Sequence, residues 1–163
     1  MSSYVYSSIL NDANNFRCIV LNIKKIKGRK CLIPYIVNSS FALELYLKLI
    51  LIANKKSYKN NHRLTELFKL ISPNIKKELL SRCNNLEELL NKYDNAFIEF
   101  RYHYELYDAK TGKEKEMMLS FNTDEIESLL LLFYNYCNSN YSNVDFVQMQ
   151  MDINKEVKNK WVR

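Results

Sequence analysis

Glycine is almost missing from this sequence, which contains two glycines, Gly28 and Gly112, and two prolines among 163 residues. Phosphate-binding loops, dinucleotide fingerprints and nucleophile elbows need clustered glycines, because their backbone takes positive φ or comes close to a ligand. Two glycines that stand 84 positions apart cannot form any of these motifs. Such a chain has few tight turns, which favours helices.

Cysteine and histidine are too scattered to indicate a metal centre. The sequence has four cysteines without a CxxC pair and two histidines, His62 and His103. Because the N-terminus has no basic segment followed by an apolar run, we expect no secretion and therefore reduced thiols. The longest apolar stretch, 41–53, is interrupted by Glu44 and Lys48 and is too short to span a bilayer. We therefore expect a soluble cytoplasmic protein with no metal or cofactor.

Positive charge is concentrated in one part of the chain. The net charge is +6, from 24 Lys and Arg against 18 Asp and Glu. Residues 21–63 hold ten basic residues and one acid, which is +9, and the remainder holds 14 against 17, which is −3. A dense basic run is either a solvated face or a contact for a polyanion such as RNA. We name residues 24–30 the basic connector; its basic residues, which we predict to bind RNA, are Lys24, Lys25, Lys27, Arg29 and Lys30.

Apolar residues recur with a helical period along most of the chain. The spacing predicts helices over residues 4–23 and 34–53, the second opened by Pro34, whose missing N–H costs nothing there. This second helix is apolar almost all round, which indicates a central element covered on several sides. A short helix is expected over residues 64–71, and Ser72-Pro73 predicts the start of the next.

A long apolar stripe follows. From Ile75 to Tyr104 the apolar residues stay in phase at alternating spacings near four and three. This pattern favours one long, bent helix. Asn84-Asn85, with Glu88 three residues after Asn85, is also the pattern of a capping box, which would divide the stripe into two helices.

The period changes beyond the stripe. Residues 106–121 contain Lys-Thr-Gly-Lys between two strand-like runs, which predicts a small β-hairpin. Asn122 or Thr123 is expected to cap a further helix. After a polar loop, residues 144–153 contain the alternation of a strand.

Together these elements predict one helical domain. We expect an all-α fold, an up-and-down bundle of four to five helices with a small β appendage. Residues 1–138 form the bundle, with the hairpin at 106–121 as an insertion. Residues 139–163 form a C-terminal tail that contains the expected strand.

One short segment gathers the residue types that RNA cleavage without a metal requires. Residues 100–105 contain Arg101, His103 and Glu105 together with two tyrosines. A histidine can move the proton of the 2′-hydroxyl, and an arginine can stabilise the charge on the phosphorane-like transition state. On one helix Arg101 and His103 point about 200° apart, so one copy of the chain cannot easily aim both at one phosphate. In the structural alternative Arg101 pairs with an acid on its own helix face, Asp94 or Glu105.

Three runs of the chain resemble HEPN-type domains. Residues 38–51, NSSFALELYLKLIL, are similar to the second helix of these domains, which carries the pattern A-x-E-x-x-L-K-A-L-L. Residues 61–68, NHRLTELF, correspond to the pattern T-H-D-L-x-x-L. Residues 97–105, FIEFRYHYE, are similar to the stretch F-V-E-W-R-Y-x-Y-E of one HEPN-like subgroup. The resemblance covers residues 37–105.

The resemblance implies a bundle of four to five helices that commonly forms a homodimer. It also implies a link to toxin–antitoxin, abortive-infection or CRISPR-linked defence, and in many members the cleavage of RNA without a metal. The partners it implies are RNA, a second copy of the chain and a cognate antitoxin or defence-system protein. We expect no membrane partner.

The candidate catalytic residues depart from the family in their spacing. Nuclease members carry an Arg that is followed by a His after four to six residues, whereas His103 comes two positions after Arg101. One interpretation is a dimeric, metal-independent endoribonuclease in which Arg101 polarises the phosphate, His103 is the general acid and base, and Glu105 orients one of them. The other is a HEPN-like module that binds RNA or a partner protein without cleaving RNA.

Overall fold

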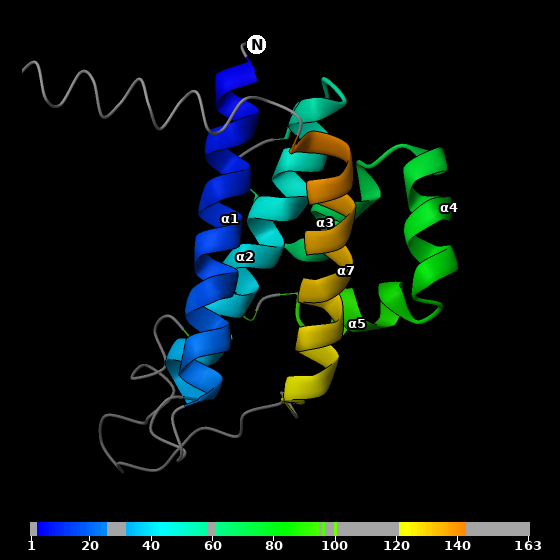
Figure 1. The fold of residues 1–163 in the computed structure, drawn as a ribbon. Coiled ribbons are helices and arrows are strands. Elements are labelled where there is room, and N and C mark those ends of the chain that lie inside the picture. Colours follow the sequence, from blue (N-terminus) through cyan, green and yellow to red (C-terminus); the bar gives the residue numbers. More distant parts are fainter. Residues whose placement is uncertain are drawn as a thin grey trace, which may run out of the picture.

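The structure, a computed structural model, describes residues 3–25, 32–58, 61–94, 96, 100 and 121–142 (Figure 1). These described residues form helices and the turns and loops between them, with no strand, so the expected all-α class is confirmed. The three long helices are α1 (Ser3–Lys24), α2 (Leu32–Ala53) and α7 (Thr123–Tyr141). The short helices are α3 (Leu64–Lys69), α4 (Pro73–Arg82) and α5 (Leu86–Lys92). The expected strand at 144–153 and the expected hairpin at 106–121, except for Phe121, lie outside the described residues.

Helix α2 is the central element of the bundle. Helices α1, α3 and α7 pack against it, and Figure 1 shows it between α1 and α7. It begins two residues before Pro34, which therefore lies in the first turn, where its missing N–H still costs no intrahelical bond. Its length and composition would allow it to cross a membrane, but most of the helix is buried inside the bundle, as in the core helix of a soluble protein.

Contacts at the two ends of the bundle fix the direction of the long helices. Lys24 at the end of α1 contacts Glu127 near the start of α7, so α1 and α7 are antiparallel. Tyr35 in the first turn of α2 also contacts Glu127, and Asn54 just beyond α2 contacts Tyr141 at the end of α7, so α2 and α7 are parallel. The chain therefore runs up and down, and short helices make up the leg that returns from α2 to α7.

The expectation of one long helix from Ile75 to Tyr104 is wrong. Helix α4 ends at Arg82, and Cys83 has an extended backbone with φ −148° and ψ 97°, which interrupts the i to i+4 hydrogen bonds. Helix α5 begins after Asn85, the residue that the alternative interpretation placed at a helix start. Asparagine favours such breaks because its side chain competes with helical backbone hydrogen bonds. The apolar stripe survives the break because both helices bury their apolar faces.

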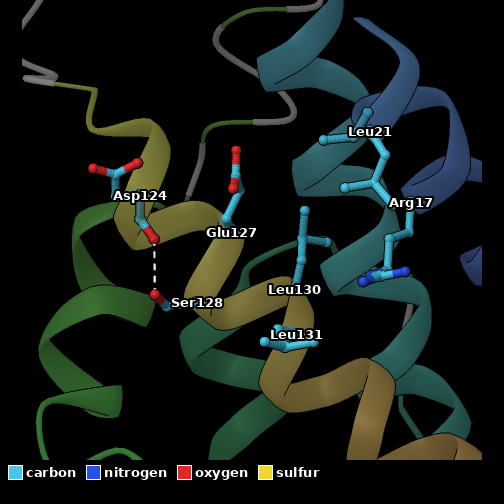
Figure 2. A pocket seen from close by; sticks show the side chains of 8 residues that line it. Arg17, Leu21, Asp124, Glu127, Ser128, Leu130 and Leu131 are labelled. Carbon is cyan, nitrogen blue, oxygen red and sulfur yellow. Dashed lines mark hydrogen bonds between the residues drawn. The ribbon is translucent and has the colours of Figure 1, made fainter. Parts of the chain in front are cut away.

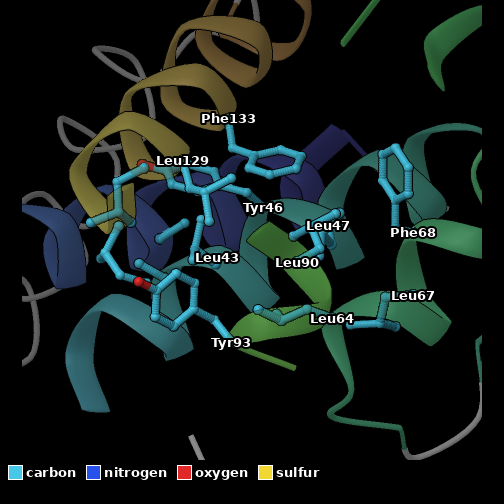
Figure 3. Close-up of a cluster of buried hydrophobic side chains, with 14 of the residues drawn as sticks. Leu43, Tyr46, Leu47, Leu64, Leu67, Phe68, Leu90, Tyr93, Leu129 and Phe133 are labelled. Atoms are coloured by element: carbon cyan, nitrogen blue, oxygen red, sulfur yellow. The ribbon is translucent and has the colours of Figure 1, made fainter. Parts of the chain in front are cut away.

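The hydrophobic core joins α2 to α3, α5 and α7 (Figure 3). Helix α2 contributes Leu43, Tyr46 and Leu47, which are fully buried. Burial of one such side chain stabilises the fold by roughly 1.5–3 kcal/mol relative to its exposure. The residues that surround them are Leu64, Leu67 and Phe68 from α3, Leu90 from α5 with Tyr93 after it, and Leu129 and Phe133 from α7.

The caps of α7 and α5 give a test of these boundaries. The Asn122 side chain accepts a hydrogen bond from the Asp124 backbone N–H at 2.9 Å, whereas Asn85 makes no side-chain cap bond. Asn122→Ala should lower the free energy of unfolding by about 1 kcal/mol and Asn85→Ala by less than about 0.5 kcal/mol. Urea unfolding measures both values, and equal losses would contradict the assigned caps.

Candidate functional site

One end of the bundle brings together the last turn of α1 and the first turns of α2 and α7. The Glu127 carboxylate accepts a hydrogen bond from Lys24 Nζ at 2.8 Å and another from Tyr35 Oη at 3.1 Å. Burial, with the nearby Glu127 carboxylate, raises the pKa of Tyr35, so the phenol keeps its proton and donates a hydrogen bond to Glu127. The hydrogen bond to Glu127 raises the pKa of Lys24, whose side chain is 52% exposed and stays charged.

An aromatic cluster occupies the same end. The ring of Phe121 packs edge-on against the rings of Tyr35, Tyr93 and Phe100, at centroid distances of 6.0, 5.5 and 6.4 Å. Phe100 and Phe121 are the described residues on either side of 101–120. Phe121 therefore lies against the first turn of α2, and Phe100 packs on Phe121.

The basic connector begins at this end as well. Lys24 is the last residue of α1, and Lys25 follows it directly. Helix α2 begins at Leu32. Lys25 is exposed, with Nζ 3.3 Å from Asn22 Oδ1, to which it donates. The other predicted RNA-binding residues, Lys27, Arg29 and Lys30, and the predicted catalytic residues, Arg101, His103 and Glu105, lie outside the described residues.

A buried carboxylate connects two of the sequence motifs. Glu44 in α2 is 1% exposed, and its Oε1 accepts a hydrogen bond from Lys48 Nζ and lies 2.9 Å from His62 Nδ1. An ionised carboxylate only accepts, so the histidine tautomer that fits carries its proton on Nδ1. The Glu44–Lys48 pair follows the i, i+4 spacing of the sequence, but the contact with His62 does not. The sequence indicated this contact only in that Glu44 and His62 belong to the two neighbouring motifs, 38–51 and 61–68.

A second buried carboxylate holds the start of α3. Asp94 is 5% exposed; its Oδ1 accepts from the backbone N–H and the hydroxyl of Thr65, and its Oδ2 accepts from Arg63 Nε, each at 2.7 Å. Asp94 thus satisfies an N–H of the first turn of α3 that has no partner within the helix. It also links α3 to the chain that leads from α5 to Phe100. The sequence alternative paired this carboxylate with Arg101, which lies outside the described residues.

The basic stretch 21–63 does not form one continuous surface. Lys48 pairs with Glu44, and Arg63 pairs with Asp94. Lys55 and Lys56 follow the far end of α2, about 30 Å from its start for a helix of 22 residues. Lys24 and Lys25, which begin the basic connector, are therefore separated along the bundle from Lys55 and Lys56. Among the described residues, no three His, Cys, Asp or Glu side chains come together as metal ligands.

Comparison with protein families gives one match. The HEPN domain model matches residues 35–146, which is more than half of the chain and runs from the first turn of α2 to beyond the end of α7. The matched range contains Glu44, Lys48 and His62 as well as the segment 101–120. Searches of curated proteins and of solved structures gave no significant match.

The Glu44 contacts predict that this carboxylate stabilises the fold. Glu44→Ala leaves Lys48, whose side chain is only 14% exposed, without its partner, so the free energy of unfolding should fall by about 2–4 kcal/mol. Glu66→Ala is the matched control, because Glu66 pairs with Lys69 at the surface and should cost less than about 1 kcal/mol. Urea unfolding of both variants checks this, and similar losses would refute a special role for Glu44.

Proposed function

The chain belongs to the HEPN domain family, and from this premise we propose that it acts on RNA in a prokaryotic defence or toxin–antitoxin system. In this proposal it works in the cytoplasm as a dimer and cuts RNA as a metal-independent endoribonuclease. One observation carries the proposal: the basic connector and the segment with Arg101, His103 and Glu105 both leave the described structure at the same end of the bundle. Partners of this kind of protein would be RNA and a cognate antitoxin or defence-system protein.

The basic connector supplies the binding half of the proposal. Its five basic residues lie within seven positions and have no acid among them. Lys24 and Lys25 are exposed in the described part of the chain. Positive side chains grouped in this way attract the phosphates of RNA and release its counterions. Glu127 pairs with Lys24 and so holds the end of α1 against α7. This contact keeps the start of the connector at this end of the bundle.

The segment 101–105 supplies the chemical half. His103 would take the proton of a 2′-hydroxyl, whose oxygen attacks the adjacent phosphorus and expels the 5′-oxygen of the next nucleotide. His103 would then return a proton to that leaving oxygen. Arg101 would stabilise the added negative charge on the phosphorus oxygens, and Glu105 would orient one of the two. The 200° between Arg101 and His103 on a single helix is the reason for a dimer, in which each copy could contribute one of them.

The second candidate function is binding without cleavage. It is favoured by the spacing of Arg101 and His103, which stand two positions apart where nuclease members of the family have four to six intervening residues. The chain would then bind RNA or a partner protein as a catalytically degenerate HEPN-like module. Arg101 would in that case contribute to the fold.

RNA binding can be assigned to one end of the bundle by charge reversal. Lys27→Glu with Lys30→Glu should weaken binding of single-stranded RNA at least about tenfold and reduce the slope of log Kd against log salt by about 1–2. Lys55→Glu with Lys56→Glu changes the net charge equally at the other end and should change Kd by less than about twofold. Fluorescence anisotropy at several salt concentrations measures both. Equal weakening would mean that net charge alone attracts the RNA.

RNA cleavage is tested in the presence of EDTA. Arg101→Ala and His103→Ala should each slow cleavage by a factor of about 10² or more, because one removes charge stabilisation and the other proton transfer. Arg82→Ala is the control, since Arg82 pairs with Glu78 on the surface of α4. Equal rates in all variants would refute the assigned residues, and a wild type that binds RNA without cutting it would favour the second candidate. A large drop in the melting temperature of Arg101→Ala would also favour it.

A further inference from the structure

A groove runs between α1 and α7 on the outside of the bundle (Figure 2). Its volume is about 320 Å³, and the buried residues Val20 and Leu130 form its apolar base. Leu21 from α1 and Leu131 from α7 also line it, although they are 40% and 49% exposed. Two of the large apolar side chains exposed in the described part of the chain therefore line one groove.

The groove carries opposite charges at its two ends. Arg17 of α1 lies at one end, with its guanidinium carbon 4.0 Å from the ring centroid of Tyr134. Asp124 lies at the other end, in the first turn of α7 and near Lys24. Asp124 and Tyr134 are ten positions apart in α7, which is about 15 Å along the helix.

Neither charge is neutralised directly. Arg17 and Asp124 make no ion pair with any residue that the structure describes. Asp124 contributes its backbone N–H to Asn122 and its carbonyl to Ser128, which leaves the carboxylate without a hydrogen bond from the described part of the chain. A surface with an unpaired cation at one end and an unpaired anion at the other is complementary to itself after a rotation of 180°.

We propose that this groove is the surface through which two copies of the chain associate. A two-fold axis across the middle of the groove brings Arg17 of each copy to Asp124 of the other. The same rotation covers Leu21 and Leu131 of each copy with those of its partner. An isologous contact of this kind closes after two copies and leaves no free half-site.

The proposal names the surface for the dimer of the proposed function, and it explains how the two copies' candidate sites could be close. The two starts of α7 would lie about 15 Å apart along the groove, because that is the separation of its charged ends. Association itself needs no RNA. Two exposed leucines per copy cover a small apolar area, so we expect a dimer that dissociates on dilution, with a Kd on the order of 10 µM.

A charge exchange tests the surface without reference to RNA. Arg17→Asp and Asp124→Arg each place like charges together at both ends of the interface, so each should raise the dimer Kd at least about tenfold. The double variant restores both pairs with reversed sign and should return the Kd to within about threefold of the wild type. Sedimentation velocity over a range of protein concentrations, with no RNA present, measures all four proteins.

Two further variants and a folding control make the result specific. Leu131→Lys should abolish the dimer, whereas Leu70→Lys should leave it unchanged, because Leu70 is 44% exposed but lies outside the groove. Circular dichroism melting establishes that each variant is folded at the temperature of the measurement. A wild type that stays monomeric, a dimer that survives the single exchanges, or a double variant that fails to recover would each overturn the proposal. Loss of the dimer with RNA binding retained would affect the dimeric mechanism and leave the binding half intact.

Discussion

The fold depends on a carboxylate buried in its most apolar helix. Glu44 stands among fully buried leucines of α2, where an unpaired charge would be costly, and it is compensated by Lys48 and His62. The lysine comes from the same helix, but the histidine comes from the loop after α2. The contact between His62 and Glu44 Oε1 therefore ties the loop before α3 to the middle of α2.

From that loop, a series of contacts leads to the candidate site. Arg63 follows His62 and binds Asp94, which also caps α3 and begins the turn that leads to Phe100. Phe100 meets Phe121 beside the first turn of α2. The motif at the middle of α2 is thus connected to Phe100 and Phe121, although it lies well inside the bundle. This gives the family signature a structural role that is distinct from the chemistry proposed for Arg101 and His103.

The sequence predicted the helices well where one periodicity belonged to one element. The boundaries of α1, the start of α7 and the apolar character of α2 followed from spacing and caps, but α7 runs to Tyr141, three residues beyond the expected end of the bundle at 138. The apolar stripe after Ile75 led to the wrong prediction of one helix, because the period of apolar residues is the same for one helix and for two helices that bury the same face. Only Asn84-Asn85 indicated the break between α4 and α5. The contact between Glu44 and His62 joins residues 18 positions apart, so no local pattern could predict it.

We propose that RNA is recognised at the end of the bundle from which the basic connector and the segment 101–120 depart. Lysine labelling of the whole protein, with and without saturating single-stranded RNA, tests it at individual side chains when the modified sites are quantified by mass spectrometry. We expect RNA to protect Lys25, Lys27 and Lys30, while Lys55 and Lys56 at the far end of α2 are modified equally in both samples. Protection centred on Lys55 and Lys56, or no protection of the connector under saturating RNA, would contradict it.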